Sequence, residues 1–185
     1  MNALTLLVAA RLRLRILVAV CLLLLGVATI RAADDAESTL TKVGQPAPAF
    51  TVTTLHGKPF DLAALKGKVV LVSFFATWCA PCMAEMPALE KQVWQRFKGD
   101  QFTMIAIGRE HTNEELGPFP QKHALSFPVA GDPKRAVYAK YATQYIPRSY
   151  VIGRDGKILF QTMGYTEAEF GQLVSAIEKE LARKP

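Results

Sequence analysis

The sequence predicts an α/β fold in which helices cover both faces of a central mixed β-sheet. Two continuously apolar runs, residues 69–75 and 102–107, have the composition of strands that are buried on both faces. The segment between them, residues 79–98, carries apolar side chains at spacings of three and four, which is typical of an amphipathic helix. A strand, a helix and a second strand in this order predict a right-handed unit with parallel strands.

Two further pairs of segments add antiparallel elements to this parallel unit. Residues 50–54 and 58–62 flank a His-Gly turn and predict a small β-hairpin as an N-terminal extension of the sheet domain. Residues 149–152 and 157–161 flank an Asp-Gly turn and predict a second hairpin, which makes the sheet mixed.

Three segments in the second half of the chain concern helices. Asp132, followed by a proline, predicts an N-cap and a helix that extends to about Tyr141. Thr166 and Glu169 form a capping-box pattern ahead of a last amphipathic helix. Residues 109–125 carry a similar capping pattern, but the prolines within them leave their structure open. The apolar face of the last helix consists of Phe170, Leu173, Val174, Ile177 and Leu181.

Length and composition restrict the class of protein. A chain of 185 residues fits one domain, and 50% hydrophobic with 21% charged residues excludes a disordered or fibrous chain. Of the 22 Lys and Arg, four Arg lie in residues 1–32, which contain no acidic residue. The rest of the chain has 18 Lys and Arg and 16 Asp and Glu, so its net charge is close to zero and we expect no binding to nucleic acid. Three cysteines are too few for a disulfide-rich scaffold.

The N-terminus has the pattern of a targeting segment. Arginines at positions 11, 13 and 15 precede a 15-residue apolar run, residues 16–30, and small residues follow. Residues 1–32 are therefore interpreted as a cleaved signal peptide or as a membrane anchor. Cleavage after Ala32 would place Ile30 at the −3 position, where a signal peptide has a small residue, so both interpretations stay open. In both cases the domain is delivered to the periplasm or another space outside the cytoplasm. It is then either soluble after cleavage or anchored to the cytoplasmic membrane by residues 16–30.

This interpretation divides the chain into three parts. The leader, residues 1–32, precedes a polar linker, residues 33–43, and a domain, residues 44–185. Cys21 is interpreted as a filler residue of the leader rather than a lipid-attachment site, because the valine before it is not small.

The chemistry of the domain is concentrated in Trp78-Cys79-Ala80-Pro81-Cys82, where a buried strand meets a helix. A helix N-terminus has free N–H groups and a partial positive charge, which stabilise a thiolate. The i, i+3 spacing places both sulfurs on one face, close enough for a disulfide. We expect Cys79 to be exposed and nucleophilic, and Cys82 to be buried and to act as the resolving thiol.

The alternative interpretations of this cysteine pair are two core cysteines or half of a zinc site. A structural zinc ion needs four ligands, and outside the leader the chain has no further cysteine. His56, His111 and His123 do not have ligand spacing, so we expect them on the surface or in loops and we expect no metal site.

Residues 72–87, Val-Ser-Phe-Phe-Ala-Thr-Trp-Cys-Ala-Pro-Cys-Met-Ala-Glu-Met-Pro, resemble the active-site segment of the TlpA- and ResA-like thiol-disulfide oxidoreductases. These proteins are extracytoplasmic members of the thioredoxin superfamily. The resemblance extends from about Gly44 to Leu181 and includes the Tyr-Ile-Pro sequence at 145–147 and the Asp-Gly-Lys hairpin. It implies a thioredoxin-like fold.

The resemblance also implies roles for individual residues. The bond between Ile146 and Pro147 is expected to be cis and to face the disulfide. Glu85, three residues after the second cysteine, is expected to lie under the active site, where we expect it to handle protons. Trp78 is expected to pack beside the cysteines, and Pro87 matches a proline that kinks the helix.

Two positions depart from the pattern of the family. Phe75 stands where many relatives have Trp, and Arg148 follows the proline where Thr or Glu is common. Because cytochrome c maturation reductases often carry Glu there, Arg148 weakens that particular assignment. A cation beside Cys79 would favour the thiolate, while the alternative is that Arg148 points into solvent.

The leading functional hypothesis is an enzyme that reduces protein disulfides outside the cytoplasm by dithiol–disulfide exchange through a Cys79–Cys82 disulfide. It needs no cofactor beyond this disulfide, and its partners are protein substrates and a membrane electron donor. The sequence leaves the substrate open among apocytochromes, copper proteins and general envelope proteins.

Two alternatives are weighed against this hypothesis. A peroxiredoxin-like peroxidase shares the fold class, but its signature places Thr three residues before the cysteine, where this chain has Ala76. A copper-binding or copper-delivery module could use both thiolates, with Met83 and Met86 nearby, although these two methionines also suit the core.

Overall fold

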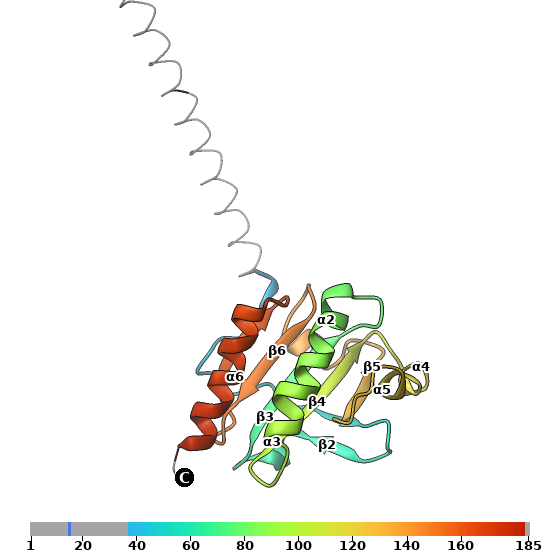
Figure 1. Cartoon of the computed structure of the whole chain (residues 1–185). Coiled ribbons are helices and arrows are strands. Elements are labelled where there is room, and N and C mark those ends of the chain that lie inside the picture. Colours follow the sequence, from blue (N-terminus) through green and yellow to red (C-terminus); the bar gives the residue numbers. More distant parts are fainter. Residues whose placement is uncertain (1–14, 16–36, 184–185) are drawn as a thin grey trace, which may run out of the picture. The chain divides into compact units, whose positions relative to one another are not determined.

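The computed structural model describes Arg15 and residues 37–183 of the chain (Figure 1). The folded domain belongs to a compact unit that starts at Thr39. The predicted leader, apart from Arg15, and residues 33–36 of the predicted linker lie outside the described residues. Among the described residues, no helix combines the length and apolar character needed to cross a bilayer.

The centre of the domain is a five-stranded sheet with the strand order β5-β4-β3-β6-β7. β4 and β5 run parallel to β3 and β4 respectively, whereas β6 pairs antiparallel with β3 and β7 pairs antiparallel with β6. The predicted mixed sheet is therefore confirmed. The strands are β3 (Val69–Phe75), β4 (Phe102–Arg109), β5 (Val129–Asp132), β6 (Arg148–Ile152) and β7 (Ile158–Met163).

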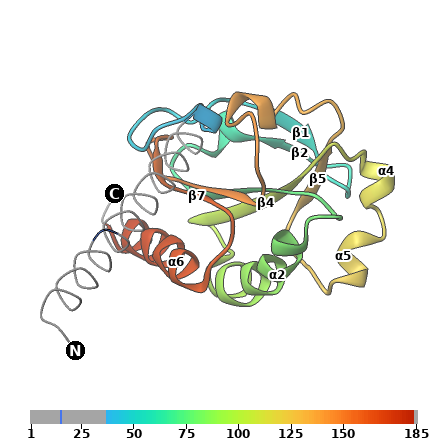
Figure 2. The same ribbon diagram turned by 90° about the horizontal axis from the view of Figure 1, so that it is seen from above.

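The two faces of the sheet are covered by different elements. Alternate side chains of β3 point to opposite faces, so Leu71 and Phe75 contact one apolar cluster and Val70, Val72 and Phe74 contact the other. Figure 2 shows α2 (Ala80–Ala88) and α6 (Glu167–Ala182) on one side of the sheet. On the other side lies the hairpin of β1 (Thr51–Thr53) and β2 (Pro59–Asp61), which pair antiparallel as predicted.

The helix predicted over residues 79–98 is helical from Ala80 to Phe97 but is not uniform. α2 is followed by a wider π-type turn, η2 (Leu89–Trp94), and by a last short α-helical turn, α3 (Gln95–Phe97). Pro87 lies just before the wider turn and has no N–H to donate within the helix. The N–H of Leu89 bonds to the carbonyls of Glu85 and Met86, so the helix continues beyond the proline.

The face of the sheet opposite α2 is closed by short elements and by aromatic side chains. The 3₁₀ turns η1 (Leu62–Leu65) and η3 (Tyr138–Lys140) provide the helices on this side. The aromatic rings meet at centroid distances of 4.9–6.2 Å, which are typical of aromatic pairs. They belong to Phe50, Phe60, Phe74, Tyr138, Tyr141 and Tyr150.

The helix predicted from Asp132 to Tyr141 is wrong. Asp132 is the last residue of β5, and only η3 is helical within this segment. The Asp132 carboxylate accepts hydrogen bonds from the N–H groups of Val137 and Tyr138, at 3.0 and 2.8 Å, which lie five and six residues later rather than the two or three of an N-cap. Arg135 has a φ of 56°, which a right-handed helix cannot include. The pattern of a cap was therefore present without the helix that it predicts.

Residues 109–125, whose structure the sequence left open, and residues 39–43, which it assigned to a linker, are parts of the domain. Residues 109–125 contain α4 (Asn113–Leu116), which begins with the Thr112 capping box, and α5 (Phe119–Lys122). Thr39 forms a β-bridge with Ala142, and the N–H of Gly44 donates to the Ile158 carbonyl at 2.8 Å. The chain from Thr39 onward therefore contacts the sheet domain ahead of Gly44, where the sequence suggested that the domain begins.

Candidate functional site

Cys79 and Cys82 form a disulfide at the junction of β3 and α2. Cys79 is the N-cap of α2, and its sulfur accepts a hydrogen bond of 3.2 Å from the N–H of Cys82. Cys79 is 6% exposed and Cys82 is fully buried, so the first sulfur is the more accessible of the two but is less open than the sequence suggested. The neighbouring Ala80 and Pro81 are exposed. A partial positive charge and one N–H group thus lie at Cys79, where a thiolate would form.

The loop before β6 brings a proline to the same end of the sheet. The Ile146–Pro147 bond is cis, and the Ile146 carbonyl oxygen lies 3.7 Å from the sulfur of Cys79. The N–H of Gly164, after β7, donates to the Pro147 carbonyl at 2.8 Å. Tyr145 precedes this pair with a φ of 66° and a side chain that is 42% exposed. The cysteine that follows β3 and the proline that precedes β6 therefore meet in space.

Glu85 lies inside the protein, one turn of α2 below Cys82. It is 1% exposed, and Ser149 of β6 donates a hydrogen bond of 3.1 Å to its Oε1 atom. Among the described residues, neither Glu85 Oε2 nor the buried hydroxyl of Ser73 has a hydrogen-bond partner of normal geometry. Burial raises the pKa of Glu85 to about 7, and the hydrogen bond from Ser149 offsets part of that rise. The carboxyl group can therefore gain or lose a proton near neutral pH.

Arg148 has a different position from both of those that the sequence suggested. Its side chain is 1% exposed, so it does not point into solvent. Its guanidinium donates to the Gln144 carbonyl at 2.9 Å and to the Thr39 hydroxyl at 2.8 Å, and it contacts the Met163 sulfur at 3.2 Å. Because Ser149 faces Glu85 and side chains alternate along a strand, Arg148 faces the side of the sheet away from α2. It holds the start of the domain against the sheet.

Near the disulfide lie Trp78, which was expected there from the sequence, and His111, for which no signal was present in the sequence. Trp78 is 62% exposed, and the guanidinium carbon of Arg109 lies 5.6 Å from the centroid of its ring. The N–H of Thr77 donates to Nε2 of His111 at 3.1 Å, so one of the three unassigned histidines contacts the active-site turn. Ser149 could have been inferred from the alternation of β6, but the contact of His111 joins two loops that are 34 residues apart.

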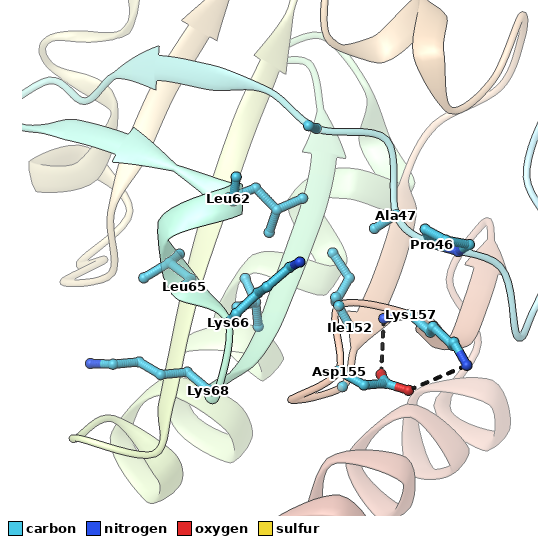
Figure 3. Close-up of a pocket in the computed structure, with 14 residues that line it drawn as sticks. Pro46, Ala47, Leu62, Leu65, Lys66, Lys68, Ile152, Asp155 and Lys157 are labelled. Carbon is cyan, nitrogen blue, oxygen red and sulfur yellow. Dashed lines mark hydrogen bonds and ion pairs between the residues drawn. The ribbon is translucent and has the colours of Figure 1, made fainter.

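A separate pocket lies at the other end of the sheet (Figure 3). It has a volume of about 330 Å³ and adjoins Val70, near the start of β3, and Ile152, the last residue of β6. Figure 3 shows Lys157 turned toward Asp155, with which it forms an ion pair of 3.8 Å. Since Cys79 follows the opposite end of β3, a strand of about 20 Å separates this pocket from the disulfide. Within residues 37–183, no three His, Cys, Asp or Glu side chains are grouped to hold a metal ion.

The mixed sheet, with a disulfide at the tip of its first long helix, defines the class of the protein as a thioredoxin-like thiol-disulfide oxidoreductase. The chain belongs to the AhpC/TSA family, which matches residues 43–161, and within that family it is related to the ResA proteins. It is 35% identical over 129 residues to the thiol-disulfide oxidoreductase ResA of Bacillus thuringiensis (strain Al Hakam). This match covers 70% of the chain and 74% of that relative.

Solved structures give the same result. A protein of Bacteroides thetaiotaomicron, proposed to be a protein disulfide isomerase, superimposes with a TM-score of 0.76 at 37% identity, over 79% of this chain and 94% of that one. A thiol:disulfide interchange protein of Chlorobium tepidum TLS superimposes with a TM-score of 0.63 at 28% identity, over 77% of this chain and 99% of that one. The fold, the family and the oxidoreductase class predicted from the sequence are thus confirmed.

The burial of Glu85 gives a prediction about stability. Because its pKa is raised in the folded protein, the folded state binds a proton that the unfolded state releases, and stability falls as the pH rises from about 4.5 to about 7. Glu85→Gln removes this loss. We expect the free energy of unfolding of the variant, relative to the wild type, to be roughly 2–3 kcal/mol higher at pH 8 than at pH 5. Urea denaturation of both oxidised proteins measures it, and an equal difference at both pH values would contradict the buried acid.

Proposed function

We propose that the protein reduces disulfides of other proteins outside the cytoplasm. The observation that carries this proposal is the position of Cys79 at the N-terminus of α2, where its sulfur accepts the N–H of Cys82. In the reduced protein the Cys79 thiolate attacks one sulfur of a substrate disulfide, and the other substrate sulfur leaves as a thiolate. Cys82 then attacks Cys79, which releases the second substrate thiolate. The substrate gains two electrons and two protons, and the protein ends as the Cys79–Cys82 disulfide.

The second step needs a group that removes the proton of Cys82. Cys82 is fully buried, and burial disfavours the charged form of a thiol. Glu85 follows three residues later on the same side of α2, and with a pKa of about 7 it can accept a proton and return it. We assign Glu85 this role, with proton transfer either direct or through a water molecule.

The surface around Cys79 suits a protein substrate. Trp78 and Tyr145, which stand on two different loops, are among the exposed large hydrophobic side chains. Exposed aromatic side chains are common in surfaces that bind other proteins. The Ile146 carbonyl and the cis-proline lie beside the sulfur, where they can align the chain of a substrate with the disulfide. We therefore assign Trp78, Ala80, Pro81 and Ile146 to the surround of the active site, and Pro147 to its functional residues together with Cys79, Cys82 and Glu85.

The location outside the cytoplasm is supported by the leader and by one relative. Residues 1–32 have the arginine-then-apolar pattern of an export signal or anchor. A structure at 27% identity, with a TM-score of 0.59, is that of a secreted disulfide oxidoreductase of Mycobacterium tuberculosis. Repeated turnover there requires a donor that reduces the Cys79–Cys82 disulfide, and we propose a membrane protein for this step. The disulfide itself serves as the redox group, without a further cofactor.

The assignment of the two cysteines is tested by labelling and trapping. In the reduced protein at mildly acidic pH we expect iodoacetamide to modify Cys79 before Cys82, because Cys79 is at the helix tip. We also expect Cys82→Ser to accumulate mixed disulfides with substrates, which mass spectrometry identifies, whereas the matched Cys79→Ser variant accumulates none. Preferential labelling of Cys82 would reverse the two roles.

The proton-handling role of Glu85 is tested by kinetics. We expect Glu85→Gln to form the mixed disulfide at a normal rate but to resolve it about 100-fold more slowly near pH 7, at the lower end of the usual contribution of a general base. Stopped-flow measurements of both steps from pH 5 to 9 separate attack from resolution. Glu178→Gln, at an exposed position of α6, is the matched control. Superimposable profiles of the wild type and Glu85→Gln would make the carboxylate a bystander.

The location is tested by fusing residues 1–40 to a reporter that is active only after export. We expect full reporter activity, because three arginines followed by an apolar run direct export. The same fusion with Leu23 and Leu24 replaced by arginine interrupts the apolar run and is expected to be inactive. An inactive wild-type fusion, with the reporter protein present in the cytoplasm, would count against a function outside the cytoplasm.

A further inference from the structure

The turn that carries Cys79 is attached to a histidine of a distant loop. His111 lies between β4 and α4, and its Nε2 atom accepts a hydrogen bond of 3.1 Å from the N–H of Thr77. The hydroxyl of Thr77 lies 3.4 Å from the same nitrogen. Thr77 is two residues before Cys79, in the turn between β3 and α2. The bond therefore joins the loop after β4 to the segment that sets the position of the attacking sulfur.

The loop that carries His111 is held rigidly by the backbone of β4 and β5. A Cβ atom added at Gly131 would lie 2.4 Å from the His111 carbonyl oxygen, so the loop packs directly on the backbone of β5. The Gly131 N–H donates to the Asn113 side chain at 2.7 Å, and the Asn113 side chain donates to the Thr53 carbonyl at 2.9 Å. The N–H of His111 itself donates to the Gly108 carbonyl at 3.2 Å. The backbone position of His111 is thus determined by several independent contacts.

A carboxylate lies near the other nitrogen of the imidazole. Glu115, in the capping box of α4, has a carboxylate oxygen 3.9 Å from Nδ1 of His111. Hydrogen bonds from the N–H and hydroxyl of Thr112 lower the pKa of Glu115, which keeps this carboxylate charged. A neutral imidazole has one donor nitrogen and one acceptor nitrogen. With the carboxylate at Nδ1 and the Thr77 N–H at Nε2, the arrangement requires the proton on Nδ1.

We propose that His111 is a positioning residue for disulfide exchange: its Nε2 lone pair anchors the Thr77 N–H and so holds Cys79 at the tip of α2. This inference rests on the proposed role of Cys79 as the attacking thiol. Without the anchor, the turn from Ala76 to Cys79 gains conformational freedom. The Cys79 sulfur then spends less time where it accepts the Cys82 N–H and faces the Ile146 carbonyl.

The proposal is tested by two substitutions of His111 that differ in one property. Glutamine can accept a hydrogen bond close to the position of Nε2, whereas leucine has a similar volume and no acceptor. At mildly acidic pH, where the thiolate fraction limits the rate, we expect His111→Leu to slow alkylation of reduced Cys79 by about three- to tenfold, the factor that corresponds to one net hydrogen bond. We expect His111→Gln to stay within about twofold of the wild type. His123→Leu, at a histidine that packs on the Phe119 ring, is the matched control.

Two measurements separate positioning from general stability. We expect amide hydrogen exchange of Thr77 to be faster in His111→Leu than in the wild type and unchanged in His111→Gln. In the wild type, ¹⁵N spectra of the imidazole should show the Nδ1–H tautomer of His111. Equal alkylation rates in all three proteins would overturn the proposal, as would a His111→Gln rate as low as that of His111→Leu, or the Nε2–H tautomer.

The result is distinguishable from a failure of the proposed function. If Cys82 is alkylated before Cys79 in the wild type, the assignment of the attacking thiol is wrong whatever the His111 variants do. If Cys79 is alkylated first and the His111 variants match the wild type, only the positioning role is wrong.

Discussion

The pairing of β3 with both of its neighbours is the constraint on which the site depends. β3 is buried along its whole length, and its register with β6 sets Ser73 opposite Ser149 and Phe74 opposite Arg148. Because the two strands are antiparallel, the end of β3 and the start of β6 lie at the same edge. The disulfide that follows one strand and the cis-proline that precedes the other therefore meet without any direct bond between their side chains. A slip of one residue would turn Ser149 away from Glu85.

A buried acid in an otherwise apolar layer is the other defining feature. The face of the sheet toward α2 and α6 contacts mainly aliphatic and aromatic side chains, with Glu85, Ser73 and Ser149 as a polar group among them. Desolvation there lowers the stability of the protein as the pH rises from about 4.5 to about 7, as the raised pKa of Glu85 indicates. Such a loss of stability is common at active sites, where burial shifts the pKa of a side chain to a value that suits its role.

The sequence was informative where local pattern and fold agree. The apolar runs gave β3 and β4, the Asp-Gly turn gave the hairpin of β6 and β7, and the cysteine spacing gave the redox pair. The strand β5 was missed because four residues at a sheet edge carry little periodicity, and the false helix after it arose from an Asp132 cap whose bonds close a turn. Arg148 and His111 depend on partners far along the chain, which no local pattern contains.

The bond between Arg148 and Thr39 has a mechanical consequence. Thr39 is where the compact domain starts, and Arg148 directly follows the cis-proline beside the disulfide. Tension applied to the polypeptide at Thr39 therefore acts on Arg148, at the start of β6, through the side-chain bond, and on the segment before β6 through the backbone bridge to Ala142. A force on the N-terminal side of the domain thus acts on the same end of β6 at which the cis-proline lies beside the disulfide.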